Sequence, residues 1–228
     1  MSRFRKLLLS LSAVAVIACV SAKAQADPIT VVGVDSGNFS TATVDCVFNA
    51  ATNTFTFTVT NTSHLTQPGS TSTITGIGFD LPPLGNASNT GLNGFTGAQA
   101  PSMTSGFDFS DGNLGNVPHG FNSVVLDFGF TTGPSGNFAG GSVALGLLPG
   151  ESASFTVSGA GFAGLTEEQI CNAIFVRFQN VPLAGGSEGS DVGVPGGNPV
   201  PEPSTMLLLG TALMGLGGVV RRRMKSRE

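Results

Sequence analysis

The sequence predicts an all-β domain, an antiparallel β-sandwich or jelly-roll-like fold, that lies between two apolar and cationic chain ends. Residues 54–60 alternate Phe55, Phe57 and Val59 with threonines, which is the period of two of a half-buried strand. Further short apolar stretches are separated by glycine, proline and asparagine, a pattern typical of sandwiches. Removal of both ends leaves residues 27–200, which is enough chain for one domain with its own core.

The predicted strands can be followed in order along the chain. They cover residues 29–34, 41–48, 54–60, 72–81, 123–131, 142–147, 152–158 and 174–179. We expect the second and third to form a hairpin across residues 49–53, and Pro149–Gly150 to form a turn. Residues 85–120 are rich in glycine, asparagine, serine and threonine, so they predict long loops and one strand near residues 103–109.

One short helix is predicted at residues 166–173. Thr166 and Gln169 have the spacing of a capping box, and the acidic residues Glu167 and Glu168 suit the positive end of a helix. Residues 184–199 are rich in glycine, proline and serine and therefore predict a flexible linker. The β-sandwich domain is accordingly assigned to residues 27–183.

Charge and cysteine content limit what this domain can bind. Residues 27–200 hold twelve acidic side chains against Arg177 alone, a formal charge of −11, which excludes nucleic acid and anionic lipid as partners. Cys46 and Cys171 remain once Cys19 leaves with the N-terminal segment. An even pair in an oxidising compartment favours a disulfide over two unpaired buried thiols, and it is an incomplete ligand set for zinc.

The N-terminus has the three parts of a secretory signal peptide, residues 1–26. Three cations in residues 1–6 precede an apolar stretch at residues 7–20, and small residues follow at Ala24 and Ala26. We expect export through Sec-type machinery and cleavage by signal peptidase before Asp27, with a site after Ala24 as the alternative. A permanent anchor is the other interpretation, but 14 apolar residues are short for a bilayer span.

The C-terminus also has three parts: a short motif, an apolar run and a basic tail. Pro201, Glu202 and Pro203 precede an apolar run at residues 206–220, which would form a transmembrane helix. A basic tail at residues 221–227 follows, and it begins with Arg221, Arg222 and Arg223. At about 1.5 Å per residue the helix would be roughly 22 Å long, shorter than a hydrocarbon core of about 30 Å. The basic tail would hold the extreme C-terminus in the cytoplasm, so this region predicts a transient anchor for a domain that faces outward.

Together, the Pro-Glu-Pro motif, the apolar helix and the arginine cluster of residues 200–228 resemble the PEP-CTERM sorting signal of Gram-negative bacteria. The resemblance implies an inner-membrane-anchored intermediate that exosortase, a membrane-embedded cysteine-type enzyme, cuts near Pro201–Pro203. It further implies a cell-surface or extracellular product, often associated with extracellular polysaccharide and biofilm. Residues 77–80, 175–179 and 188–191 are similar to segments of a paired-cysteine subgroup called cistern.

The motifs that could indicate catalysis or cofactor binding lack the surrounding elements that such sites need. Residues 159–164 match a dinucleotide-binding pattern, but the predicted helix begins only after Thr166 and is too short to cross over a parallel sheet. Residues 185–189 match a nucleophile-elbow pattern, but neither a helix nor a histidine follows them. His64 and His119 lie in loop-like sequence without a visible nucleophile or ligand set, so we interpret both as surface histidines. We therefore expect no enzyme activity and no cofactor.

Calcium is the one metal for which the sequence offers ligands. Asp108, Asp111 and Asn113 are closely spaced, although they depart from the EF-hand pattern and Asp-Gly is also a common turn. The sequence thus favours a structural or adhesive component of the cell surface, extracellular polysaccharide or biofilm matrix. A calcium-dependent or carbohydrate-binding module and a secreted hydrolase remain the alternatives.

Overall fold

The computed structural model describes residues 28–64, 70–82, 94–101, 106–133, 137–182 and 188–196. The predicted signal peptide and the predicted sorting region, including its transmembrane helix, lie outside the described residues. Within the described ranges, no helix combines the length and the apolar character needed to span a bilayer.

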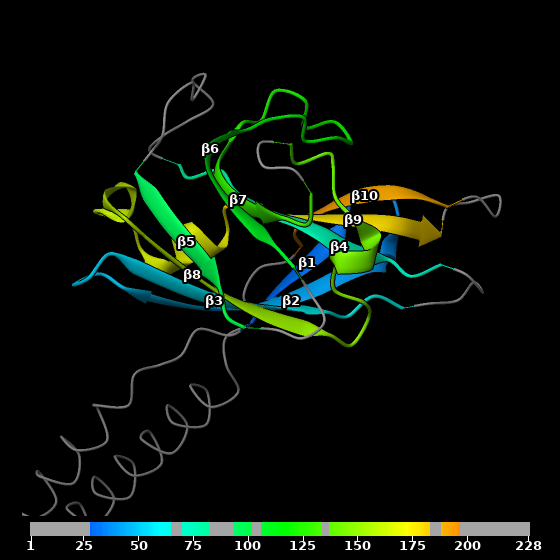
Figure 1. The fold of residues 1–228 in the computed structure, drawn as a ribbon, viewed down its shortest axis with the longest axis horizontal. Coiled ribbons are helices and arrows are strands. Elements are labelled where there is room, and N and C mark those ends of the chain that lie inside the picture. The colour runs from blue at the N-terminus through cyan, green and yellow to red at the C-terminus, as the bar shows by residue number, and fades with distance from the viewer. Residues whose placement is uncertain are drawn as a thin grey trace, which may run out of the picture.

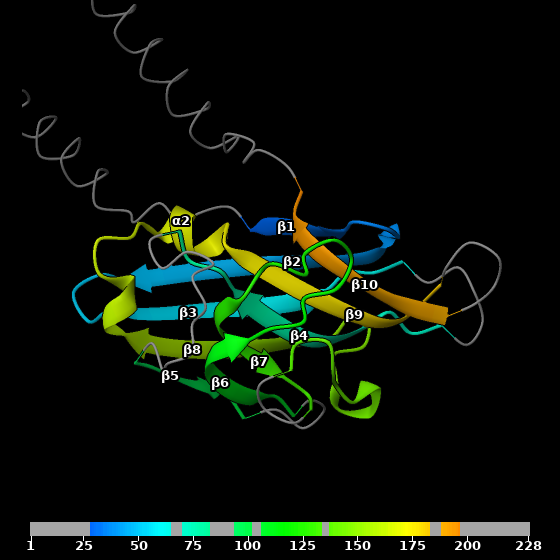
Figure 2. The same ribbon diagram turned by 90° about the horizontal axis from the view of Figure 1, so that it is seen from above.

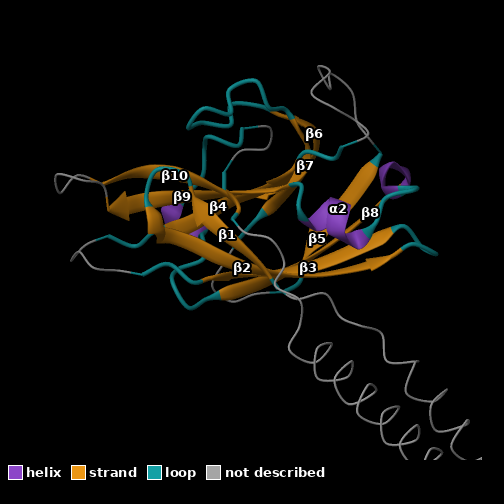
Figure 3. Ribbon diagram, turned by 180° about the vertical axis from the view of Figure 1, so that it is seen from behind, coloured by secondary structure: helices purple, strands orange, loops and turns teal. Residues whose placement is uncertain are grey.

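Nearly all regular structure is β-strand (Figure 1, Figure 3). The strands are β1 (Ile29–Gly33), β2 (Gly37–Asn49), β3 (Thr54–Asn61), β4 (Thr73–Phe79), β5 (Phe95–Gln99), β6 (Asp108–Leu114), β7 (Leu126–Thr131), β8 (Ser152–Gly159), β9 (Ile174–Pro182) and β10 (Glu188–Pro195). The short helices are η1 (Val143–Leu145), η2 (Ala160–Phe162) and α2 (Glu167–Cys171). All pairings between these strands are antiparallel, so the predicted all-β class is confirmed.

The strands form one continuous sheet in the order β5-β8-β3-β2-β1-β10-β9-β4-β7-β6 (Figure 2). The sheet curls over so that its two halves face each other. Phe57 of β3 and Phe79 of β4 meet at a ring-centroid distance of 5.0 Å, although four strands separate β3 from β4 in the sheet. The edge strands also approach, since the Gly94 N–H donates to the Asp111 carboxylate at 3.0 Å. The two layers are therefore halves of a single sheet.

Strand β3 follows the predicted alternation, β8 alternates in the same way, and the β2–β3 hairpin is confirmed. Phe55, Phe57 and Val59 point into the core, and the intervening residues point outward. The outward residues pair as hydroxyls across β3 and β8, and we call them the hydroxyl face. Its members are Thr54, Thr56, Thr58 and Thr60 on β3 and Ser152, Ser154, Thr156 and Ser158 on β8.

Phenylalanine fills the core, because the chain has no tryptophan or tyrosine. Nine phenylalanines are among the largest fully buried side chains: Phe55, Phe57, Phe79, Phe128, Phe130, Phe138, Phe155, Phe162 and Phe178. Phe57 is central, and four rings lie within 6.0 Å of its centroid, from Phe55, Phe79, Phe130 and Phe155. Rings of both sheet halves thus meet around one side chain.

A second apolar group, the outer cluster, lies on the opposite face of the sheet. It consists of Leu114, Val117, Leu126, Phe138 and Val192. These residues come from β6, β7, β10 and the loops beside them, so the cluster fixes the loop of residues 115–125 against the sheet. That loop carries His119.

Arg177 of β9 lies close to the outer cluster and is only 6% exposed. A side chain at Gly76 would contact both Arg177 and Phe138, which places these two residues on the same side of β4. Desolvation lowers the pKa of the Arg177 guanidinium. Since residues 27–200 contain no other lysine or arginine, their one guanidinium is removed from the surface.

Helix α2 is held in the way that the sequence predicts. The Thr166 hydroxyl accepts from the Gln169 N–H, and the Gln169 side chain accepts from the Thr166 N–H, which completes the capping box. Glu167 of the same helix accepts from the Phe48 N–H of β2 at 2.7 Å. A disulfide joins Cys171 of the helix to Cys46 of β2, with their Cα atoms 6.4 Å apart.

The prediction of a strand at residues 142–147 is wrong. Val143–Leu145 form the helix η1, and Leu147 contributes only an isolated bridge to Ile74 of β4. Gly146 lies so close to the Ile74 carbonyl that a side chain there would collide with it. The segment therefore pairs with β4 at one antiparallel bridge and does not form a strand.

The linker predicted at residues 184–199 is wrong over Glu188–Pro195, which form β10. This strand pairs with β1 on one side and β9 on the other, so the domain extends beyond residue 183. Its glycine content reflects close packing, because a side chain at Gly193 would collide with Val31 and Phe178.

The loop prediction for residues 85–120 is also corrected in part. Phe95–Gln99 form β5 and Asp108–Leu114 form β6, the two edge strands. The strand expected near residues 103–109 overlaps β6 only at Asp108 and Phe109. Gly97 leaves room for the Phe109 ring, which closes the two edges over the core.

Candidate functional site

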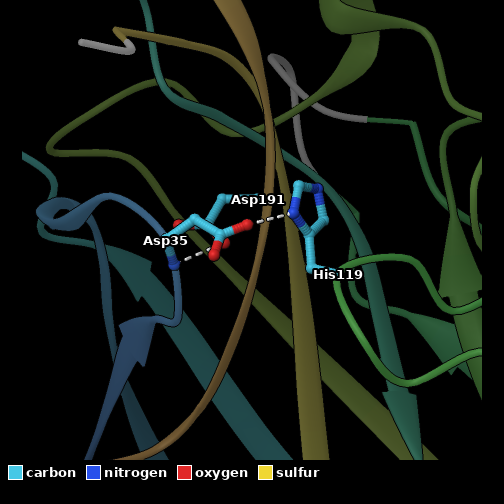
Figure 4. Close-up of side chains that lie close together, drawn as sticks. All are labelled: Asp35, His119 and Asp191. Atoms are coloured by element: carbon cyan, nitrogen blue, oxygen red, sulfur yellow. Dashed lines mark hydrogen bonds and ion pairs between the residues drawn. The ribbon is translucent and has the colours of Figure 1, made fainter.

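Three segments that are far apart in the sequence meet beside the outer cluster. The turn between β1 and β2 supplies Asp35, β10 supplies Asp191, and the loop after β6 supplies His119 (Figure 4). One ligand-type atom of each residue lies within 4.8 Å of the others. Pairing of β1 with β10 brings the two aspartates together, and the outer cluster brings the histidine to them.

Asp191 is fully buried and well anchored. Its carboxylate accepts from the backbone N–H groups of Asp35 at 3.3 Å, Ser36 at 2.8 Å and Val192 at 2.7 Å. It also accepts from the Ser36 hydroxyl. Gly33 permits this arrangement, because a Cβ at that position would occupy the place of the carboxylate. The buried negative charge thus holds the β1–β2 turn in shape.

His119 connects the turn to β10 through both ring nitrogens. Its Nδ1 lies 2.5 Å from Asp35 Oδ2, and its Nε2 lies 3.3 Å from the Ser190 hydroxyl. The His119 side chain is 20% exposed and that of Asp35 is 58% exposed, so solvent reaches the pair. His119 therefore lies where solvent reaches it, but with two partners that the sequence did not reveal. His64, the other histidine, is exposed as predicted.

The connections Ser190–His119–Asp35 have the order of a nucleophile, a base and an orienting carboxylate. In that template the carboxylate is buried. Here the contacting carboxylate is the exposed one, whereas the buried carboxylate of Asp191 is occupied by backbone donors. The arrangement suits the binding of a proton or a cation between Asp35 and His119 better than activation of Ser190.

The predicted calcium ligands are not brought together in this way. Asp108 and Asp111 lie three residues apart in β6, where the register with β7 is regular from Asp108 to Asp111. Since successive side chains of a strand alternate between its faces, the two carboxylates point to opposite sides. Asn113 belongs to the same strand. Calcium binding at these residues stays a prediction without support from their placement.

A depression of about 580 Å³ opens elsewhere, between the end of β4, helix α2 and β9. Asp80, Glu168 and Phe175 contribute to its lining. Burial raises the pKa of Asp80 above its ordinary value of 3.8, because desolvation disfavours the charged carboxylate. The folded chain therefore takes up this proton at a higher pH than the unfolded chain does, and the charged form costs stability at neutral pH.

Asp80→Asn is accordingly expected to raise the free energy of unfolding at neutral pH. The advantage should shrink as the pH falls through the raised pKa and vanish below 3.8, where both states of the wild-type protein bind the proton. Urea denaturation of the two proteins across this pH range measures the difference. An advantage that does not change with pH would contradict the assignment to desolvation of Asp80.

Comparison with known proteins gives a match that lies in the C-terminal region. Residues 199–223 match the family model of the PEP-CTERM protein-sorting motif. The chain carries a PEP-CTERM protein-sorting motif at its C-terminus. The match contains the predicted processing residues Pro201, Glu202 and Pro203 and the three arginines that follow the apolar run. A search of curated proteins and a search of solved structures find no match to the chain.

The PEP-CTERM motif carries consequences for processing and location. It implies exosortase as the processing partner, export with a membrane-anchored intermediate, and then the cell surface. Ala24, Ala26 and the processing residues from Pro201 to Arg223 lie outside the described residues. The Cys46–Cys171 disulfide is present, while membership of the paired-cysteine subgroup stays a prediction.

Proposed function

We propose that the mature domain of this PEP-CTERM protein is a non-catalytic structural or adhesive component of the cell surface or extracellular matrix. The observation that supports the adhesive role is the hydroxyl face on β3 and β8. Its four cross-strand pairs have oxygen–oxygen distances of 3.2, 3.4, 2.8 and 2.7 Å. In an exported protein, such a face meets the surrounding polymer directly.

The chemistry of the hydroxyl face suits a polymer that is itself rich in hydroxyls. In the three pairs other than Thr54–Ser158, one proton forms the internal hydrogen bond, so one O–H and several lone pairs stay available for a ligand. The Thr54 hydroxyl also donates to the Thr52 carbonyl. The rows repeat about every 6.8 Å along a strand and about every 4.8 Å between strands. Thr56, Thr156 and Ser152 are exposed. An extracellular polysaccharide is the partner class that this regular, polar surface fits.

Thr56→Val with Thr156→Val tests this role. Valine has nearly the shape of threonine and favours strands, so the fold is retained while the central hydroxyl pair is lost. We expect weaker co-sedimentation of the exported protein with polysaccharide isolated from the producing cells. Thr52→Val with Thr62→Val is the matched control, because these exposed threonines lie outside the hydroxyl face. Equal sedimentation of both variants and the wild type would refute adhesion through this face.

Processing is tested separately at the PEP-CTERM motif. Replacement of Pro201, Glu202 and Pro203 by alanine is expected to leave the chain in the inner membrane with its basic tail attached. Intact mass spectrometry and cell fractionation measure both effects. Alanine at Gly197 and Asn198, just outside the matched residues, is the control and should leave processing unchanged. Normal release of the triple variant would refute recognition at these residues.

A secreted hydrolase is the second candidate, and the Ser190–His119–Asp35 connection is the observation that favours it. An activated serine reacts covalently with a fluorophosphonate, and its reaction depends on the neighbouring histidine. Labelling of Ser190 that is lost in His119→Gln would support hydrolase chemistry. Absence of labelling would leave the non-catalytic role as the better account.

A further inference from the structure

We infer that Asp35, His119 and Asp191 form a binding site for one divalent transition-metal ion of the Zn²⁺ type. The three side chains offer one imidazole nitrogen and two carboxylates, with ligand-type atoms within 4.8 Å of one another. They come from three separate segments, the β1–β2 turn, the loop after β6 and β10 (Figure 4). An ion at this position would join the first strand, the last strand and the loop that covers them.

The contact between His119 and Asp35 directs two ligand-type atoms toward one position. Nδ1 and Oδ2 lie 2.5 Å apart, while Nε2 lies 3.3 Å from the Ser190 hydroxyl. In the tautomer in which Nε2–H donates to the Ser190 hydroxyl, the lone pair of Nδ1 points toward Asp35 Oδ2, and a cation bound by both atoms would replace the proton that otherwise joins them. A metal-bound histidine commonly donates its other ring N–H to such a partner, which is the role that this geometry gives Ser190.

Asp191 can join this set without loss of its backbone contacts. Its Oδ2 accepts from both the N–H and the hydroxyl of Ser36. The Ser36 hydroxyl also lies 2.6 Å from the Ser40 hydroxyl, so rotation of its proton toward Ser40 frees a lone pair on Asp191. The backbone donors from Asp35, Ser36 and Val192 then still hold the carboxylate in place.

The negative charge of the cluster and its access to solvent also favour a divalent cation. Two carboxylates and one imidazole leave the cluster negative whether or not the ring is protonated, in a segment whose formal charge is −11 over residues 27–200. The 58% exposure of the Asp35 side chain gives an ion a route from solvent. Nitrogen and carboxylate ligands suit Zn²⁺, whereas Ca²⁺ takes six to eight oxygens. Three protein ligands leave a coordination position open for water or an external ligand.

The test uses the exported protein, stripped of metal with a chelator and then titrated with ZnCl₂ by calorimetry. We expect one Zn²⁺ per chain and a higher melting temperature of the zinc-loaded protein, because a ligand that binds only the folded chain stabilises it. Co²⁺ in place of Zn²⁺ should give visible absorption bands of a site with nitrogen and oxygen ligands. CaCl₂ at the same concentration should give neither heat nor a shift in melting temperature.

Two pairs of variants separate this site from adventitious binding. His119→Gln and Asp35→Asn are expected to weaken zinc binding by about 100-fold, because loss of a direct ligand costs at least as much as the roughly 10–100-fold of an outer-shell partner. His64→Gln and Asp108→Asn are the matched controls, since both residues are exposed and lie outside the cluster, and they should bind as the wild type does. Circular dichroism confirms that each variant is folded.

Three results would overturn the inference. The first is the absence of stoichiometric zinc binding by the wild-type protein. The second is equal binding by His119→Gln and His64→Gln, which would place the ion elsewhere. The third is a melting temperature that falls in His119→Gln but does not respond to zinc in either protein, which would make the cluster an ion pair between Asp35 and His119 alone.

Discussion

Replacement of Cys46 and Cys171 together by alanine is expected to lower the free energy of unfolding by about 5 kcal/mol. The two residues are separated by 125 positions, so their bond removes much of the freedom of the unfolded chain. Both are buried, at 4% and 2% exposure, and they connect the hairpin strand β2 to helix α2. Guanidinium denaturation of the wild type and the double variant measures the difference.

Reduction of the wild-type protein separates the bond from the packing of the two side chains. Wild type in excess reductant should unfold close to the double variant, because both lack the cross-link while one retains the sulfur atoms. A double variant that unfolds at the same denaturant concentration as the oxidised wild type would show that the two cysteines do not cross-link the native domain.

Phe57→Ala is expected to cost about 3–5 kcal/mol of unfolding free energy. The ring is 1% exposed and stacks on Phe55 and Phe155 at 5.1 Å from each. Removal of the ring leaves a cavity between the two halves of the sheet. The rings around this cavity belong to four strands, so they cannot all move inward to fill it. Urea denaturation provides the measurement.

Phe121→Ala is the matched comparison for this prediction. Phe121 is partly buried at the edge of the outer cluster, and its ring centroid lies 5.3 Å from that of Phe175. We expect a loss of roughly 1 kcal/mol there, since less apolar area leaves water on folding. Equal losses for the two variants would mean that the phenylalanines around Phe57 do not form the central core.

The strands that could be predicted are those with one buried and one exposed face. Thr54–Asn61 and Ser152–Gly159 alternate because β3 and β8 separate the core from the hydroxyl face. Helix α2 could be predicted for a different reason, since Thr166 and Gln169 act locally, within a single turn. In each case the sequence pattern follows from a constraint within the element itself, either burial of one face of a strand or capping of one helical turn.

The strands that were missed depend on distant partners. Glu188–Pro195 is polar and rich in glycine, so its local preference is for a linker, yet it pairs with β1 and β9 in the middle of the sheet. Phe95–Gln99 became an edge strand through its register with β8, from Phe95–Gly159 to Gln99–Phe155. Nothing within these segments reveals those pairings.

The candidate metal site was missed for the same reason. Asp35 and Asp191 lie 156 residues apart, and they meet only because the sheet places β1 beside β10. The signals that were present are modest: His119 between Pro118 and Gly120, and Asp191 within a short polar segment. Neither signal indicates a partner until the topology is known.

The central position of β10 has a consequence for the timing of folding. Strand β1 has β10 as one of its two neighbours in the sheet. The sheet therefore cannot be completed until residues up to 195 are available for pairing. Only five residues separate Pro195 from Pro201, so this final strand is released immediately before the membrane-retained tail. Completion of the sheet therefore requires the segment that directly precedes the PEP-CTERM motif.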